Sequence, residues 1–372
     1  MQARRIAFTV LAVFLATSLT WGQTEVLKSV VNNLALYKQK KDIKYLGNAK
    51  KSIDSVIKAA PDSTDLERNV FRAEVNAVIL YVDSLNKLGN PAVLFNQTVT
   101  LVDKLSLQRK IFRYEEEMNY AKQCLANVYI RKAYGFLSKA DYTNALRLFQ
   151  NAQNYAPGYK PISAYIAYCD YKLGHLNSAA QLYSRLIESN TASAEYVETA
   201  SNIYKTLGDT AMALTIVQKG RKLLPLDNSI LLDEANIFTN KRDYQSLYPL
   251  LPALLETYTN NADVEFVAAN CYDHLNQYDK AVTYYLKAID INSSAYEPIF
   301  NLGVLLLKKS EISRHSADDQ DLLQAATWLE KANEISPNDV RCLKALEMVY
   351  SKTGNQDQIN KISNKLNQLN NQ

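Results

Sequence analysis

The stretch "YKTLGDTAMALTIVQKGRKLLP", Tyr204 to Pro225, contains the pattern that decides the fold. Gly208 and Asp209 stand before an apolar run, Ala213 follows them at short distance, and a proline closes the segment. Glycine readily adopts the left-handed conformation that ends many helices, aspartate caps the start of a helix, and proline interrupts one. The stretch therefore predicts the end of one helix, a tight turn, and a second helix that stops near Pro225.

The same arrangement recurs along the chain at a fixed period. Steps of 34 from Ala213 reach small or aliphatic residues at Ala145, Ala179, Leu247 and Ala281. The position four residues later is apolar or aromatic at each step: Phe149, Tyr183, Val217, Leu251 and Tyr285. Turn residues precede each step in the same way, as in Gly174-His175 and Asn276-Gln277. Self-similarity at such a period is the signature of a stacked repeat architecture.

The period and its small residues resemble the tetratricopeptide repeat family, whose 34-residue unit is a helix–turn–helix with small residues at its eighth and twentieth positions. The eighth position is small in six successive units: Ala133, Ala167, Ser201, Ala235, Ala269 and Gly303. The resemblance covers residues 126–372 and implies an all-α fold, a right-handed superhelical solenoid of antiparallel helix pairs. At the helix crossing, an approach of roughly 8–10 Å requires small side chains such as Ala213.

We expect about seven units, and several depart from the regular pattern. They are residues 126–159, 160–193, 194–227, 228–261, 262–295, 296–339 and 340–372. An insertion over 311–321 delays the second half of the sixth unit, and Pro249 and Pro252 should delay or kink the second helix of the fourth. The last helix is strongly polar, which suits the end cap that stacked repeats need.

Residues 24–125 are predicted to be helical but out of step with the repeat. We expect helices over about 65–88, 92–105 and 108–123. This irregular region either continues the stack or forms a separate helical cap.

Residues 1–23 have the pattern of a secretory signal peptide. Arg4 and Arg5 precede an apolar run from Ile6 to Leu19, and small residues precede Gln23. The alternative is an uncleaved anchor, although the run is short against the roughly 20 residues of a spanning helix. A signal peptide that ends at a residue such as Gln23 resembles those of Bacteroidetes-type bacteria. We therefore expect an exported, periplasmic or envelope-associated protein with no membrane span after cleavage.

The charge balance argues against nucleic acid or anionic lipid as partners. Without Arg4 and Arg5, the 42 basic residues fall to 40 against 38 acidic residues, a net charge of +2. Neither partner is favoured by so small a charge.

The sequence contains no recognisable catalytic or metal-binding constellation. Its three histidines, His175, His274 and His315, have no carboxylate or cysteine at ligand spacing. The acidic runs at 115–117 and 318–321 lack the alternating pattern of a calcium loop. The four cysteines are expected to be free, small, buried apolar groups. We predict no cofactor, no metal and no enzymatic activity.

The remaining candidate is a binding surface on the first helix of each unit. In the family that this sequence resembles, these helices line a concave groove that binds extended segments. Two sets of residues are candidates for partner binding: Asn202, Asn236 and Asn270, each at the ninth position, and Tyr134, Tyr168 and Tyr171. A ladder of amides offers donors and acceptors to a peptide backbone, and tyrosine offers contact area with a hydroxyl. The alternatives are an ordinary exposed polar position for the asparagines and core packing for the tyrosines.

The predicted function is a non-catalytic protein-interaction scaffold or adaptor of the cell envelope, with a protein or peptide partner. Two other readings stay open. One is a structural subunit of an envelope assembly, and the other is an enzyme whose site lies in residues 24–125.

Overall fold

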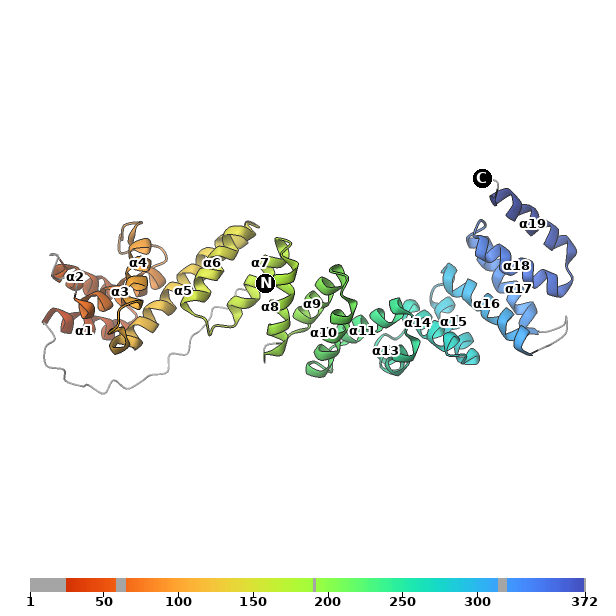
Figure 1. Ribbon diagram of the computed structural model, residues 1–372, viewed down its shortest axis with the longest axis horizontal. Helices are drawn as coiled ribbons and strands as arrows, with labels where there is room; N and C mark the ends of the chain where they lie inside the picture. Colours follow the sequence, from red (N-terminus) through yellow and green to blue (C-terminus); the bar gives the residue numbers. More distant parts are fainter. Residues whose placement is uncertain (1–24, 58–64, 190–191, 314–319, 371–372) are drawn as a thin grey trace. The chain divides into compact units, whose positions relative to one another are not determined.

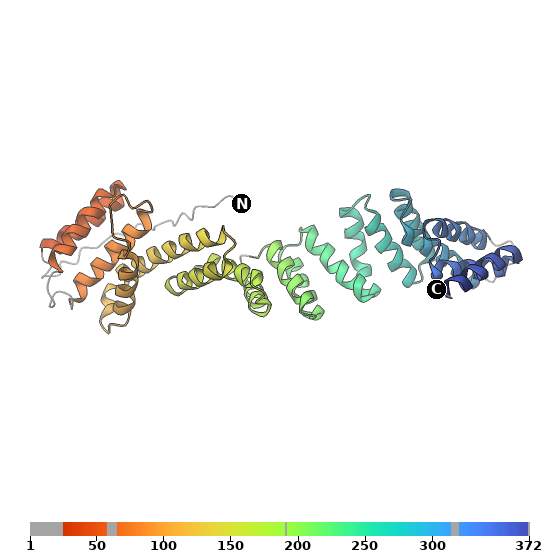
Figure 2. The same ribbon diagram turned by 90° about the horizontal axis from the view of Figure 1, so that it is seen from above.

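The computed structural model describes residues 25–57, 65–189, 192–313 and 320–370, and every regular element in these ranges is a helix (Figures 1 and 2). The predicted all-α fold of helix pairs is confirmed. The predicted signal peptide lies outside the described residues, as does most of the predicted insertion. The chain forms two compact units, one up to Leu182 and one from Tyr183.

The first unit contains the irregular region and the beginning of the repeats. Its helices are α1 (Glu25–Lys40), α2 (Lys44–Val56), α3 (Leu66–Val82), α4 (Leu94–Ser106), a short 3-10 helix η2 (Ile111–Tyr114), α5 (Glu115–Leu137), α6 (Tyr142–Tyr155) and α7 (Pro161–Lys172). The division between the two units falls within the next helix, α8 (Leu176–Glu188). α1 packs against α2, α3 against α5, and α5 against α6.

Helix α5 crosses the predicted boundary between the irregular region and the repeats. Met118 and Ala121 belong to the core shared with α1, α2 and α3, whereas Tyr129 and Ala133 belong to the core shared with α6 and α7. One continuous helix of 23 residues thus serves both cores. No helix end falls at residues 125 and 126.

The second unit is a succession of helix pairs. They are α9 (Ala194–Thr206) with α10 (Thr210–Leu223), α11 (Asn228–Lys241) with α12 (Tyr244–Leu247), η3 (Tyr248–Leu250) and α13 (Leu251–Thr257), α14 (Ala262–His274) with α15 (Tyr278–Ile291), α16 (Tyr296–Ser313) with α17 (Gln320–Ile335), and α18 (Val340–Thr353) with α19 (Gln356–Asn370). The second helix of the fourth repeat is broken where Pro249 and Pro252 lack a backbone N–H, as predicted.

The small residues at the helix crossings are buried as the period requires. Ala145, Ala179, Ala213 and Ala281 have no exposed surface. The eighth position is buried as well in the six repeats from Ala133 to Gly303. Close contact between paired helices therefore recurs once per repeat along this part of the chain.

The turns between paired helices repeat one backbone conformation. At the same place in successive repeats the chain has a positive φ, at Ala140 (58°), Gly174 (78°), Gly208 (79°), Arg242 (55°) and Asn276 (58°). The N–H of the next residue bonds to the carbonyl five residues earlier each time, as from Asp209 to Tyr204 at 2.9 Å. This hydrogen bond closes the first helix with a left-handed residue. Asp209 then accepts a bond from the Met212 N–H and caps the second helix, as predicted.

The last helix, α19, covers the end of the core of the second unit with one face. Ile362 and Leu366 are buried there, and Ile359 and Leu369 pack beside them. Its other side chains are mainly Asn, Gln and Lys. This division suits the predicted end cap.

Candidate interaction surface

Five of the six candidate residues occupy the ninth position of successive repeats. Tyr134, Tyr168, Asn202, Asn236 and Asn270 follow one another at intervals of one repeat, on α5, α7, α9, α11 and α14. Tyr171 lies one helical turn after Tyr168. Residues at this spacing take equivalent places on their helices, so the period presents each of them in the same way.

Asn202 and Asn236 are exposed, and no hydrogen bond joins their side-chain amides to the described part of the chain. Each amide has two donors and one acceptor to offer. Both residues are therefore available to a partner.

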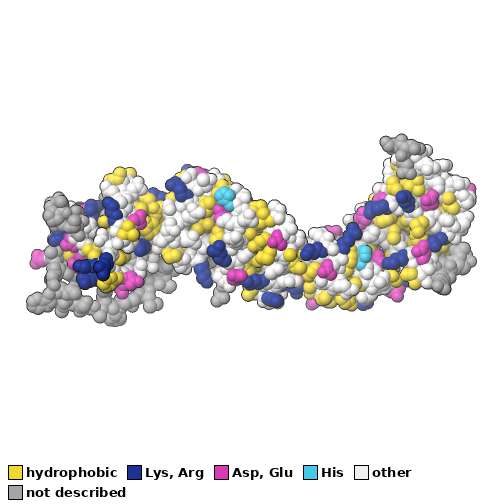
Figure 3. All heavy atoms as spheres, in the orientation of Figure 1, with side chains coloured by type: hydrophobic (Ala, Val, Ile, Leu, Met, Phe, Trp, Pro, Cys, Tyr) yellow, Lys and Arg dark blue, Asp and Glu magenta, His cyan; other side chains and the backbone are white. Residues whose placement is uncertain are grey.

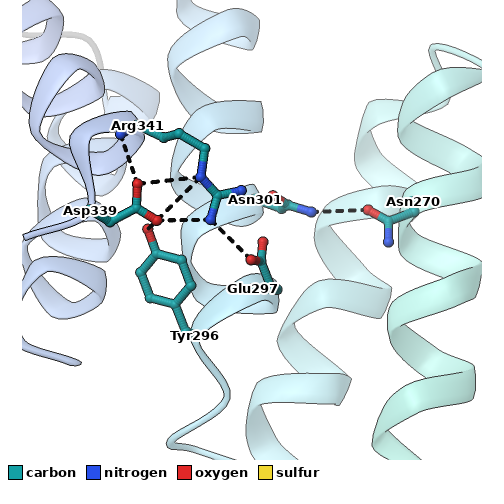
Figure 4. Close-up of polar contacts among 6 residues, drawn as sticks. All are labelled: Asn270, Tyr296, Glu297, Asn301, Asp339 and Arg341. Carbon is teal, nitrogen blue, oxygen red and sulfur yellow. Dashed lines mark hydrogen bonds and ion pairs between the residues drawn. The ribbon is translucent and has the colours of Figure 1, made fainter. Parts of the chain in front are cut away.

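Asn270 differs from the other two asparagines because the fold uses its amide oxygen. Its Oδ1 accepts a hydrogen bond of 2.7 Å from the Tyr285 hydroxyl. The same oxygen accepts one of 3.1 Å from Nδ2 of Asn301 (Figure 4). Tyr285 is almost fully buried on α15, and Asn301 lies on α16. Asn270 thus connects three helices, and only its donors remain for a partner.

Polar bonds between successive first helices lie beside the asparagines. Asp233 on α11 accepts a hydrogen bond of 2.7 Å from the Ser201 hydroxyl and forms an ion pair of 2.6 Å with Nζ of Lys205. Ser201 and Lys205 both lie on α9. These bonds hold the helices that carry Asn202 and Asn236. Asp233 was not among the residues predicted from the sequence. Its signal was a separation from Ser201 of 32 residues, close to one period.

A larger network joins α16 to the start of α18 (Figure 4). The Arg341 guanidinium donates to Asp339 Oδ2 at 2.8 Å and to Glu297 Oε1 at 3.0 Å, and the Tyr296 hydroxyl donates to Asp339 at 2.7 Å. Hydrogen bonding to Arg341 lowers the pKa of Asp339 to about 2. The Arg341 guanidinium also lies 5.1 Å from the ring centre of Phe300. The network stabilises the junction of the last two repeats.

The three candidate tyrosines do not form a single patch. Tyr134 is 37% exposed, and its ring meets the edges or faces of Phe149 and Tyr165 at centroid distances of 5.7 and 5.1 Å. Burial, followed by a hydrogen bond with Tyr165, raises its pKa. Tyr168 and Tyr171 lie together around Lys172, whose Nζ is 5.5 and 5.7 Å from their ring centres. Tyr134 and Tyr168 thus both take part in packing, since Tyr168 is half-buried with its ring centre 6.1 Å from that of Tyr142, whereas Tyr171 is exposed beside Lys172.

The matches to known families come from the repeated part of the chain. Residues 136–203 and residues 266–294 match two models described as tetratricopeptide repeat. These two stretches of the chain are tetratricopeptide repeats. Repeats of this family are protein-interaction scaffolds in general.

Similar proteins share the repeats at low identity. The protein CTR9 homolog of Arabidopsis thaliana is 24% identical over 228 residues, which cover 58% of this chain and 20% of the relative. The chain therefore spans about a fifth of the length of that curated relative.

Three solved structures show comparable likeness. MamA matches with a TM-score of 0.41 at 18% identity, over 46% of this chain and 94% of its own. YrrB, a TPR protein described as having an unusual peptide-binding site, has a TM-score of 0.42 at 18% identity, over 51% and 93%. The C-terminal part of a TPR repeat-containing protein from Cytophaga hutchinsonii has a TM-score of 0.46 at 16% identity, over 64% and 95%.

One contact of His175 was not predicted from the sequence. The structure places a carboxylate beside His175, because the turn brings Oδ1 of Asp170 to 3.0 Å from its Nδ1. Ser178 donates to the other Asp170 oxygen at 2.5 Å and not to the histidine. Asp170 thus joins Ser178 and His175, and the three side chains brace the turn between α7 and α8.

The cysteines behave as predicted, since Cys124, Cys169, Cys271 and Cys342 are free and buried. Burial raises the pKa of the Cys124 thiol to about 12 and that of the other three to about 11. Such thiols are poor nucleophiles.

The described side chains form no group of three or more His, Cys, Asp or Glu that could hold a metal ion. None of the helices in the described ranges has both the length and the apolar content needed to cross a bilayer. On the face seen in Figure 3, basic and acidic side chains are interspersed, in keeping with the small net charge.

Proposed function

We propose that this protein is a non-catalytic scaffold or adaptor of the cell envelope that binds an extended protein segment along α9 and α11. The observation that supports the proposal best is the pair Asn202 and Asn236. Both side chains are exposed, lie one repeat apart, and have no hydrogen-bond partner among the described residues.

The binding mode follows from the spacing of the two helices. Successive first helices lie roughly 8–10 Å apart when packed, and an extended chain rises about 3.3 Å per residue. The two amides would therefore meet a bound segment about three residues apart. Each amide offers both a donor and an acceptor, so it suits a backbone N–H or a carbonyl alike. Recognition would depend on an extended backbone more than on particular side chains.

The bonds to Asp233 support this mode because they restrict movement between α9 and α11. A site whose parts are held before binding loses less entropy on association. Lys205 and Ser201 lie on the same helix as Asn202, so their bonds to Asp233 position it relative to Asn236.

The envelope setting rests on the sequence of residues 1–23 alone. Cell fractionation, with sequencing of the mature N-terminus, tests it. A chain that begins near Gln23 in an exported fraction would support the setting, and a full-length chain in the cytoplasm would contradict it.

Binding is tested by the double variant Asn202→Ala/Asn236→Ala. A matched control is Asn364→Ala/Asn367→Ala, which removes two exposed amides from α19. Each protein is immobilised and used to select from a library of unstructured peptides, and partners are also isolated from the native envelope fraction. We expect the double variant to lose the peptides and partners that wild type and control retain. Equal recovery by all three proteins would reject the amide pair as the site.

The stoichiometry of the recovered partners separates the scaffold from a structural subunit. A set of extended clients at substoichiometric amounts supports an adaptor. One stable complex with fixed composition, recovered equally with the double variant, supports a structural subunit of an envelope assembly.

A further inference from the structure

A buried carboxyl group lies where three helices of the first unit meet. Glu74 is in the middle of α3 and only 4% exposed. The charged and titratable groups that interact with it come from two other helices: Lys38 from α1, and Glu117, Tyr120 and Cys124 from α5. The site is thus a cluster of ionisable side chains inside a helical core.

The Glu74 carboxyl has no hydrogen bond or ion pair to any described residue. Lys38 is the cation that acts on it across space, and its Nζ lies 5.1 Å from the ring centre of Tyr120. An unpaired charge in such a place is costly, so burial favours the protonated form.

Glu74 titrates near neutral pH in this environment. Burial raises its pKa to about 7, with Glu117 adding to the effect and Lys38 opposing it. Burial also raises the pKa of Cys124 to about 12 and moves the pKa values of Tyr37 and Tyr120 upward. The thiol and both hydroxyls therefore remain protonated where Glu74 changes charge.

We propose that Glu74 makes the packing of α1 against α3 and α5 proton-dependent, so that α1 is held firmly in acid and loosens as the pH rises to neutrality. Tyr37 and Lys38 connect α1 to this cluster, and opening α1 would admit water to the carboxyl. In the opened state Glu74 would titrate near its ordinary pKa of 4.5. The closed state therefore binds the proton more tightly, and stability is lost as the pH rises from about 4.5 to about 7.

Hydrogen exchange of the α1 amides, corrected for the intrinsic effect of pH, tests the proposal. Between pH 5 and pH 8 the opening constant of α1 in the wild-type chain should rise on the order of 70-fold. Glu74→Gln should remove this dependence. Lys38→Met should increase it, because the cation that favours the carboxylate is gone. Glu265→Gln, at a buried glutamate of α14, is the control and should match wild type.

A role in packing alone has a different outcome. If Glu74→Gln shifted the exchange of α1 equally at both pH values and kept the dependence, the proposal would be wrong. Exchange of wild-type α1 that is the same at pH 5 and pH 8 after correction would also overturn it, whatever the variants do.

Discussion

Gly303 lies where α16 crosses α17, and adding one methyl group there tests the repeat packing. A Cβ at Gly303 would lie 2.7 Å from Cγ of Leu329 and 3.2 Å from the Leu329 backbone nitrogen. Leu329 is fully buried, so neither its side chain nor its backbone has space to withdraw. Overpacking of this kind costs about 1–3 kcal/mol.

The same substitution also changes helix propensity, and a second glycine separates the two effects. Alanine in a helix interior is favoured over glycine by about 0.5–1 kcal/mol. Gly135 lies exposed in α5, and a Cβ there would have no neighbour within 4 Å. Gly135→Ala should therefore stabilise the protein by about 0.5–1 kcal/mol. The difference between the two variants isolates the steric cost, about 1–3 kcal/mol.

The assay is urea denaturation together with hydrogen exchange of α16 and α17, which reports the local stability of the sixth repeat. A double-mutant cycle with Leu329→Ala identifies the contact, because removing the leucine side chain relieves most of the clash. Leu329→Ala alone should lower the free energy of unfolding by about 2–5 kcal/mol. The double variant should lose less than the sum of the losses of the two single variants. If Gly303→Ala stabilises the protein as much as Gly135→Ala does, the helices do not cross at this position, and the argument from small residues fails.

Three other expectations concern the turns, the last junction and the cysteines. Gly208→Ala should lower the free energy of unfolding by about 1 kcal/mol because alanine is strained at a φ of 79°. Asn276→Gly, at a φ of 58°, should raise that free energy by up to about 1 kcal/mol. Urea denaturation measures both changes. Asp339→Asn should keep the helix cap but destabilise the α16–α18 junction at neutral pH. Because the pKa of Asp339 is lowered to about 2, the difference in stability between variant and wild type should shrink as the pH falls from about 4 to about 2. Hydrogen exchange of α18 measures this difference. The opposite trend would contradict the role of the Arg341 pair. Iodoacetamide should leave the four buried thiols of the native protein unmodified and react with them only on unfolding. Rapid labelling of any of them in the native protein, detected by mass spectrometry, would contradict their burial.

The sequence predicted the repeat because its physical causes are local. A small residue at the crossing, a residue that tolerates a positive φ and a capping aspartate act over a few neighbours each, and their recurrence at one fixed period made them visible. Ala213, Gly208 and Asp209 all take the roles that the opening stretch indicated. The break in the fourth repeat was predictable for the same reason, since proline lacks an N–H wherever it stands.

The path of α5 needed the tertiary structure. Nothing local at residues 125 and 126 ends a helix there. The two halves of α5 differ only in which helices they pack against, and that depends on residues far away in the sequence.

The states of the asparagines and of Glu74 were also decided by packing between helices. Asn202, Asn236 and Asn270 have the same repeat position, yet only Asn270 meets a partner from each of two other helices in the described part of the chain. Glu74 is a polar residue in the middle of α3, and its burial follows from the helices that pack against α3, above all α5. Repetition along the chain determines which residues face the same way, but the environment of each side chain depends on neighbours that the local pattern does not contain.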